Sequence, residues 1–119
     1  MTTLRYVGEM ELLPSAARTN AAAANGADVD VSQFSEGEIL LDVTAVSGTS
    51  PTLTLTLEVK SRLVAGYFTH TALESALAIA GAVKKRYAVT NFGGIIRVVH
   101  NVGGTTPSIT YSLTFVGKT

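Results

Sequence analysis

Residues 46–60, VSGTSPTLTLTLEVK, and residues 102–116, VGGTTPSITYSLTFV, are two copies of one pattern at an offset of 56 residues. Each copy follows an apolar, β-branched run, Ile39 to Val46 in the first and Ile95 to Val102 in the second. Six of the fifteen aligned positions are identical: Val46/Val102, Gly48/Gly104, Thr49/Thr105, Pro51/Pro107, Thr54/Thr110 and Leu57/Leu113. The chain therefore carries a duplicated unit of strand, turn and strand.

The middle of each copy has the chemistry of a chain reversal. Gly48 and Gly104 can adopt backbone angles that are closed to other residues. Pro51 and Pro107 fix φ and have no N–H to donate to a strand ladder. The sequence therefore predicts two related hairpins, each with a Gly-Thr-Ser/Thr-Pro connection.

The stretch after each proline alternates between apolar and polar residues. Leu53, Leu55 and Leu57 alternate with threonines, and residues 109–115 repeat the pattern as apolar side chains alternating with Thr110, Ser112 and Thr114. A period of two is typical of a strand that buries one face. Two hairpins with one apolar face each are expected to stack, so we predict an all-β fold, an antiparallel β-sandwich of the jelly-roll or immunoglobulin-like kind.

The rest of the chain gives further expected elements. Strand character is expected at Leu4–Leu13, around Val29 and Val31, and at Lys85–Thr90. Residues 15–26, rich in alanine and asparagine, predict an exposed connection, so that residues 1–26 include an N-terminal arm. Residues 72–80, ALESALAIA, are compatible with one short helix, with a buried loop or a strand as the alternatives.

Composition limits the domain count and the chemistry. A length of 119 residues with 46% hydrophobic content suits a single domain over residues 1–119. The charged fraction of 15% argues against disorder. The absence of cysteine excludes disulfides, thiol nucleophiles and cysteine-based zinc sites. No stretch approaches the roughly 20 apolar residues of a membrane-spanning helix, and we expect neither a signal peptide nor a membrane partner.

Charge is distributed unevenly along a chain of zero net charge. Residues 1–58 hold eight carboxylates and two arginines, whereas residues 59–119 hold seven cations and one glutamate. If the two halves lay on different faces, copies could associate head to tail. The simpler expectation is that the halves interleave in one sandwich and their charges cancel.

The polar residues predict no catalytic, cofactor or metal site. His70 and His100 have no neighbouring carboxylate or histidine at ligand spacing, and His100 is expected on the polar side of its strand. Asp28, Asp30 and Asp42 could bind a hard cation such as calcium, but without a glycine-anchored acidic loop they predict a solvated acidic edge.

The remaining motifs also predict structure rather than chemistry. The run Lys84-Lys85-Arg86 beside Tyr87 could bind nucleic acid, but three charges in a neutral chain favour a solvated strand or a protein contact. The pairs Gly93-Gly94 and Gly103-Gly104 are turn glycines, and no Gly-x-Ser-x-Gly elbow is present. We therefore expect neither an enzyme nor a nucleic-acid-binding protein.

Residues 40–60, LLDVTAVSGTSPTLTLTLEVK, and residues 97–117, RVVHNVGGTTPSITYSLTFVG, resemble small structural proteins from the virion modules of tailed bacteriophages and prophages. LLPSAART and ADVDVSQF resemble the same group. The resemblance implies a β-sandwich virion component, with a capsid decoration or cement protein on the head as the favoured assignment. Such a protein would be made in the host bacterial cytoplasm and located on the capsid surface. Residues 61–82, SRLVAGYFTHTALESALAIAGA, depart from the pattern.

The expected partners are the major capsid protein, other copies of the chain, or both, with a trimer favoured. The segment Thr2–Leu13 could add a strand to a neighbour, although an ordinary edge strand of its own sheet is an equal alternative. A tail or neck subunit is the alternative function. A carbohydrate-binding module ranks lower because the chain has no Trp and four Tyr, and a small enzyme ranks last. The candidate contact residues are Tyr6, Leu12, Leu13, Tyr67, Phe68, Leu73 and Leu77.

Overall fold

The computed structural model describes residues 7–119, and this part of the chain is built from strands without a helix. No helix there is long and apolar enough to cross a membrane. The strands are β1 (Val7–Arg18), β2 (Ala24–Asn25), β3 (Val29–Asp30), β4 (Glu36–Lys60), β5 (Tyr67–Ala78), β6 (Val83–Thr90) and β7 (Ile95–Lys118).

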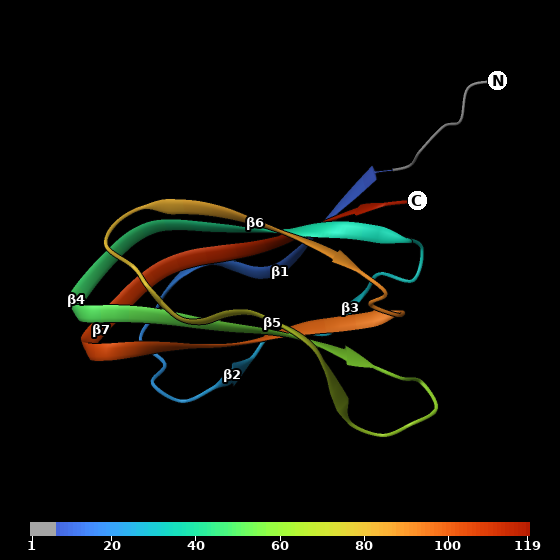
Figure 1. The fold of residues 1–119 in the computed structure, drawn as a ribbon, viewed down its shortest axis with the longest axis horizontal. Helices are drawn as coiled ribbons and strands as arrows, with labels where there is room; N and C mark the ends of the chain where they lie inside the picture. The colour runs from blue at the N-terminus through green and yellow to red at the C-terminus, as the bar shows by residue number, and fades with distance from the viewer. Residues whose placement is uncertain (1–6) are drawn as a thin grey trace.

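The two long strands, β4 and β7, form the frame of the molecule. They pair antiparallel along their whole length, from Glu36 opposite Lys118 to Lys60 opposite Ile95. Figure 1 shows this two-stranded ribbon running along one layer, turning at the left end and returning in a second layer. The predicted all-β antiparallel sandwich is confirmed.

Each layer contains one half of the ribbon and the strands that flank it. Residues 36–47 and 108–118 lie between β6 and β1, and residues 52–60 and 95–103 lie between β5 and the short strands β2 and β3. β2 and β3 can be taken as one interrupted strand, and the bends divide β4 and β7 into two segments each, which gives eight segments in chain order. The first segment pairs with the eighth, the second with the seventh, the third with the sixth and the fourth with the fifth. This nested pairing, wrapped into two four-stranded layers, is a jelly roll.

The two repeats pair differently from the hairpins that the sequence predicts. The two arms of each repeat pair with the other repeat, and they face each other across the core instead of bonding to each other. Both arms carry an apolar face, and folding the ribbon presses these faces together. A flat hairpin would have left both faces on the same exposed surface.

The two bends of the ribbon, at residues 48–51 and 104–107, have the same conformation as well as a similar sequence. Gly48 and Gly104 have φ of 103° and 118°, and two residues later Ser50 and Thr106 have φ of 50° and 49°. The bends also pack on each other: a Cβ on Gly48 would lie 2.6 Å from the Thr106 carbonyl oxygen, and one on Gly104 would lie 2.8 Å from that of Ser50. Glycine is therefore required at both positions.

The core lies between the layers and follows the predicted alternation. The largest of the fully buried side chains are Tyr111, Phe115, Ile39, Leu41, Leu53, Leu55, Leu57, Ile96, Ile109, Leu113, Val31 and Val43. At one end, the ring of Phe92 meets that of Phe115 edge-on at 5.3 Å between centroids. Burying residues of this kind contributes about 1.5–3 kcal/mol each.

Of the three alternatives for residues 72–80, a short helix, a buried loop or a strand, the structure shows the strand, because residues up to Ala78 belong to β5. Leu73 and Leu77 pack against the core from this edge strand, which pairs with β4 through three register shifts. The exposed connection predicted over residues 15–26 is wrong in part, because β1 continues to Arg18 and β2 pairs with β7. The strands expected near Val29 and over residues 85–90 are confirmed as β3 and β6.

Candidate functional site

Salt bridges on the outer faces join the two oppositely charged halves of the chain. In the described part of the chain, residues 7–119, six ion pairs are present, and five of them join a carboxylate from residues 1–58 to a cation from residues 59–119. These five are Asp28–Lys60, Asp30–Arg62, Asp42–Lys84, Glu38–Arg86 and Glu58–Arg97. The interleaved arrangement is therefore the correct one, and the described ion pairs give no acidic and basic poles for head-to-tail association.

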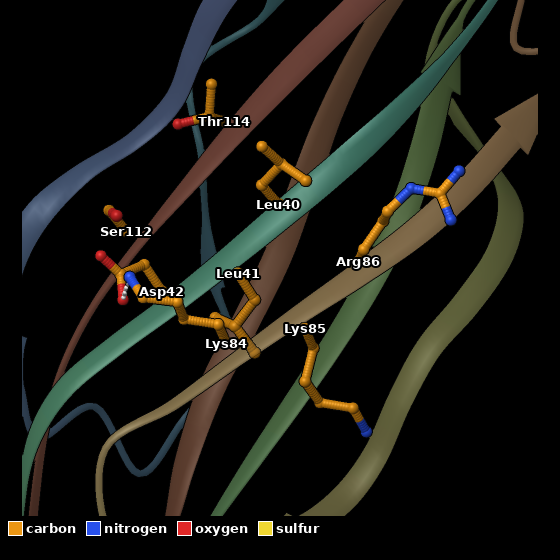
Figure 2. Close-up of a pocket in the computed structure, with 8 residues that line it drawn as sticks. All are labelled: Leu40, Leu41, Asp42, Lys84, Lys85, Arg86, Ser112 and Thr114. Carbon is orange, nitrogen blue, oxygen red and sulfur yellow. Dashed lines mark hydrogen bonds and ion pairs between the residues drawn. The ribbon is translucent and has the colours of Figure 1, made fainter.

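A shallow groove crosses the outer face of the layer that contains β6. It is lined by Leu40, Leu41, Asp42, Lys84, Lys85, Arg86, Ser112 and Thr114. Figure 2 shows Lys84 directed at Asp42 and Lys85 directed away from both. The Lys84 Nζ lies 2.9 Å from the Asp42 Oδ1. The other two cations of the basic run also contact carboxylates: Lys85 pairs with Glu74, and Arg86 pairs with Glu38. The run lies on an edge strand whose charges are matched by neighbouring strands.

Polar side chains connect β5 to β6 where the two layers meet at their open edge. Glu74 Oε1 accepts hydrogen bonds from Lys85 Nζ at 2.6 Å and from the Tyr87 hydroxyl at 2.8 Å. The bond from Lys85, followed by that from Tyr87, lowers the pKa of Glu74 despite partial burial. Burial, followed by the Glu74 carboxylate, raises the pKa of Tyr87. This polar seam, Glu74 with Lys85 and Tyr87, closes one side of the sandwich.

A second network crosses the outer face of the other layer. The Tyr67 hydroxyl donates to the Asp28 carboxylate, with distances of 2.8 and 2.9 Å to its two oxygens. The Arg97 guanidinium lies 3.4 Å from the centre of the Tyr67 ring and pairs with Glu58 at 2.8 Å. Asp28, Arg97, Glu58 and Tyr67 come from both edges and the middle of the layer, so the network holds its strands together.

His100 lies inside the sandwich, contrary to the expected polar position. Ile96, Val98 and Val102 point inward with it, and its side chain is 6% exposed. Its Nδ1 is 2.6 Å from the Tyr111 hydroxyl. Burial, followed by the nearby Arg18 charge, lowers the pKa of His100, and burial raises that of Tyr111 to about 12.

Arg18 covers this buried pair from the end of β1. Its guanidinium lies 4.5 Å from the centre of the Tyr111 ring and donates to the carbonyl oxygens of Tyr111 and Pro14. The other histidine, His70, has its Nε2 2.7 Å from the Thr90 carbonyl oxygen. Both histidines thus contact strands of their own fold.

Three of the four large hydrophobic side chains that are exposed among residues 7–119 lie in the connection between β4 and β5 or at the start of β5. Leu63 is 96% exposed, Val64 54% and Phe68 49%. Figure 1 shows this connection protruding from the end of the molecule opposite the bends. We call Leu63, Val64 and Phe68 the apolar tip. Sequence reasoning missed Leu63 and Val64, although an apolar pair outside any alternating strand was the available signal.

The structure separates the candidate contact residues. Leu12 and Leu13 are 3% and 5% exposed and belong to the core, so neither is available to a partner, and residues 7–13 pair with β7 of their own chain. Leu73 and Leu77 also pack against the core from β5. The Tyr67 hydroxyl is engaged by Asp28, which leaves Phe68 as the candidate with an exposed ring. Tyr6 lies outside the described residues.

The folded two-stranded ribbon defines the class of fold, and solved structures share it. The chain superposes on VP2 of infectious bursal disease virus, in a structure of the VP2 subviral particle, with a TM-score of 0.69, 9% identity and 96% of this chain covered. The Gx strain of the same virus gives a TM-score of 0.62 at 10% identity, with 98% covered. This chain spans about a third, 32%, of both viral chains.

A bacterial structure matches over nearly the full length of both chains. A Bacillus endospore appendage protein, described as forming disulfide-linked pili, gives a TM-score of 0.50 at 16% identity. The match covers 98% of this chain and 89% of that chain. No protein-family model and no curated protein sequence matches the chain. The likenesses establish the jelly-roll fold.

Proposed function

We propose that this protein is a non-enzymatic structural subunit of a virion, a capsid decoration or cement protein of a tailed phage head. The observation that carries the proposal is the jelly-roll fold, which matches VP2 of a viral particle over nearly the whole of this chain. The duplicated Gly-Thr-Ser/Thr-Pro bends, which resemble phage virion proteins, add the tailed-phage assignment. Its partners would be the major capsid protein and other copies of itself.

The organisation of the surface supports a role in assembly. Cations of the outer faces already meet carboxylates of the same chain, as Lys84 and Arg97 do, so they offer little attraction to an anionic ligand. An exposed apolar tip, in contrast, is a feature of surfaces that meet other proteins. Weak contacts of this kind hold firmly when many copies are displayed on one lattice.

A subunit of a tail, neck or other polymer is the second candidate. The match to an endospore pilus protein covers most of both chains, which favours a subunit that joins end to end or in rings. This chain has no cysteine, so its contacts in such a polymer would not be disulfides. A carbohydrate-binding role has less support, because Tyr67 and Tyr87 are engaged by carboxylates and Tyr111 is buried.

The test is the position and copy number of the protein in purified particles. Cryo-electron microscopy of particles that contain the protein, with quantitative mass spectrometry against the major capsid protein, separates the candidates. We expect density on the outer head surface and a copy number that matches the capsid lattice. Density confined to the tail or neck would establish the second candidate, and absence from particles would refute both.

A further inference from the structure

The apolar tip is a built feature of the fold. Of the described residues, four large hydrophobic side chains are exposed, and three of them fall within six consecutive positions at Leu63, Val64 and Phe68. The Ser61 hydroxyl accepts hydrogen bonds from the backbone N–H groups of Leu63 and Val64, at 3.0 and 3.2 Å. This turn fixes the backbone that presents Leu63 to solvent, so less conformational entropy is lost when Leu63 binds.

A shallow groove lies directly beside the tip. Apolar side chains line it, and so do the two glycines Gly93 and Gly94. The apolar lining residues are Val59, Leu63, Phe68 and Ile95. A Cβ on Gly93 would meet no atom within 4 Å, and one on Gly94 would meet Ser32 at 3.6 Å, so no side chain fills this space. A protruding leucine and an apolar hollow thus lie next to each other on one surface.

The charges around the tip are of both signs. Asp30 and Arg62 form an ion pair at 3.0 Å whose side chains are 57% and 67% exposed, and Asp28 pairs with Lys60 at 3.5 Å. Equal numbers of acids and bases favour neither an acidic nor a basic partner. A surface with both signs complements itself when it is rotated by a twofold axis, which brings the acid of one copy to the base of the other.

We propose that the apolar tip binds a second copy of this chain about a twofold axis, with Leu63 of each copy entering the groove beside Phe68 of the other. Asp30 and Arg62 exchange partners across the rim. The inference rests on the proposed structural role for the expectation that copies meet, and it names the surface where they do. This twofold contact joins neighbouring units and is separate from any contact that closes a trimer.

The size of the tip sets the strength of the contact. Stable protein interfaces bury roughly 1,200–2,000 Å² in total, and three exposed apolar side chains per copy provide only the centre of such an area. The contact is therefore weak between free molecules. It becomes effective when copies are held side by side in an assembly, where the second contact is intramolecular.

Analytical ultracentrifugation of the full chain, from about 10 µM to about 1 mM, tests the contact. We expect a monomer–dimer equilibrium in the wild type and a dissociation constant at least about tenfold higher for Leu63→Asp. Val64→Asp should also weaken association, whereas Val7→Asp should not. Val7 is the matched control because it has the same 54% exposure and lies on β1.

Two further sets of variants test the groove and the rim. Gly94→Leu fills the hollow while leaving Leu63 intact, and it should abolish dimerisation. Arg62→Asp and Asp30→Arg should each dimerise poorly alone, because like charges meet across the axis, and an equimolar mixture should recover heterodimers. Circular dichroism checks that each variant is folded.

Three results would overturn the inference: a monomeric wild type across the whole range, a Leu63→Asp variant that associates like the wild type, or a mixture no better than its components. The particle experiment fails independently of this one. A protein absent from virions that still dimerises through Leu63 refutes the proposed function alone. A virion protein whose association ignores Leu63 refutes this inference alone.

Discussion

The β4–β7 ribbon and the β5 edge strand with its preceding connection are built in different ways. The ribbon pairs two copies of one sequence, and its bends lock reciprocally at Gly48 and Gly104. β5 pairs with β4 through three register shifts, and its Ala76 has a φ of 50°. The β4–β7 ribbon is therefore a frame specified by a sequence pattern that occurs twice. β5 and the connection before it form an edge that carries the exposed apolar side chains.

The largest expected effect comes from breaking the lock between the bends. Gly48→Ala places a Cβ 2.6 Å from the Thr106 carbonyl oxygen, on a backbone with φ of 103°. Because both strain and collision act on a bend that cannot relax without moving its partner, we expect a loss of at least about 2 kcal/mol in the free energy of unfolding. Urea denaturation followed by circular dichroism measures it.

Two other glycines separate strain from collision. Gly66 has φ of 92° but open space around its Cβ position, so Gly66→Ala should cost strain alone, about 1 kcal/mol. Gly81 has neither feature, and Gly81→Ala should change stability by less than about 0.5 kcal/mol. Equal losses at Gly48 and Gly66 would show that the two bends do not lock each other.

The buried His100 makes the ribbon sensitive to acid. Its pKa in the folded protein is lowered from 6.5, first by burial and then by Arg18, so the unfolded chain binds the proton more readily. The stability due to neutral His100 is therefore fully present above pH 6.5 and is lost as the pH falls below it. One proton can change stability by at most about 1.4 kcal/mol per pH unit.

Unfolding curves at pH 7 and pH 5.5 test this dependence. We expect the wild type to lose stability over this interval and His100→Gln to lose much less. Glu74 acts in a separate window, because its pKa is lowered from 4.5 and its contribution is lost only below that pH. A slope that survives in His100→Gln would assign the acid sensitivity to another group.

Much of the frame could be predicted from sequence, because its signals are local. The alternation in residues 53–57 and 109–115 decides which side chains are buried, and the glycines and prolines fix where the chain turns. The pairing of each arm with the other repeat is not a local property. It follows from burying two apolar faces at once, which only the three-dimensional arrangement decides.

The edge was harder to predict, for reasons visible in single residues. Residues 72–78 have the composition of a helix, yet β5 gains more by packing Leu73 and Leu77 on the core while pairing with β4. His100 was expected outward because it is polar and follows Val99, although Ile96, Val98 and Val102 share its phase and place it inward. Leu12 and Leu13 were expected to contact partners because nothing in β1 itself reveals which face is covered.

Cutting the polar seam tests how firmly the edge is attached to the frame. Glu74→Gln weakens the contacts to Lys85 and Tyr87, which link β5 to β6. Because these side chains are partly exposed, we expect a global loss below about 1 kcal/mol. Hydrogen exchange should show the local effect, with faster exchange in β5 and little change in the ribbon. A uniform increase over β4 and β7 would mean that edge and frame unfold together.

The last expected effect is a gain in stability rather than a loss, and it concerns the bends again. Thr106 holds a φ of 49°, which is strained for a β-branched residue, whereas asparagine tolerates this region. Thr106→Asn should therefore raise the free energy of unfolding by up to about 1 kcal/mol, as measured by urea denaturation. Ser50→Asn at the equivalent position should gain less, since serine is not β-branched and is less strained at φ of 50°. Equal gains at both positions would show that the branched side chain of Thr106 adds no strain. A loss at Thr106 would mean that its side chain stabilises the bend by more than the strain it imposes.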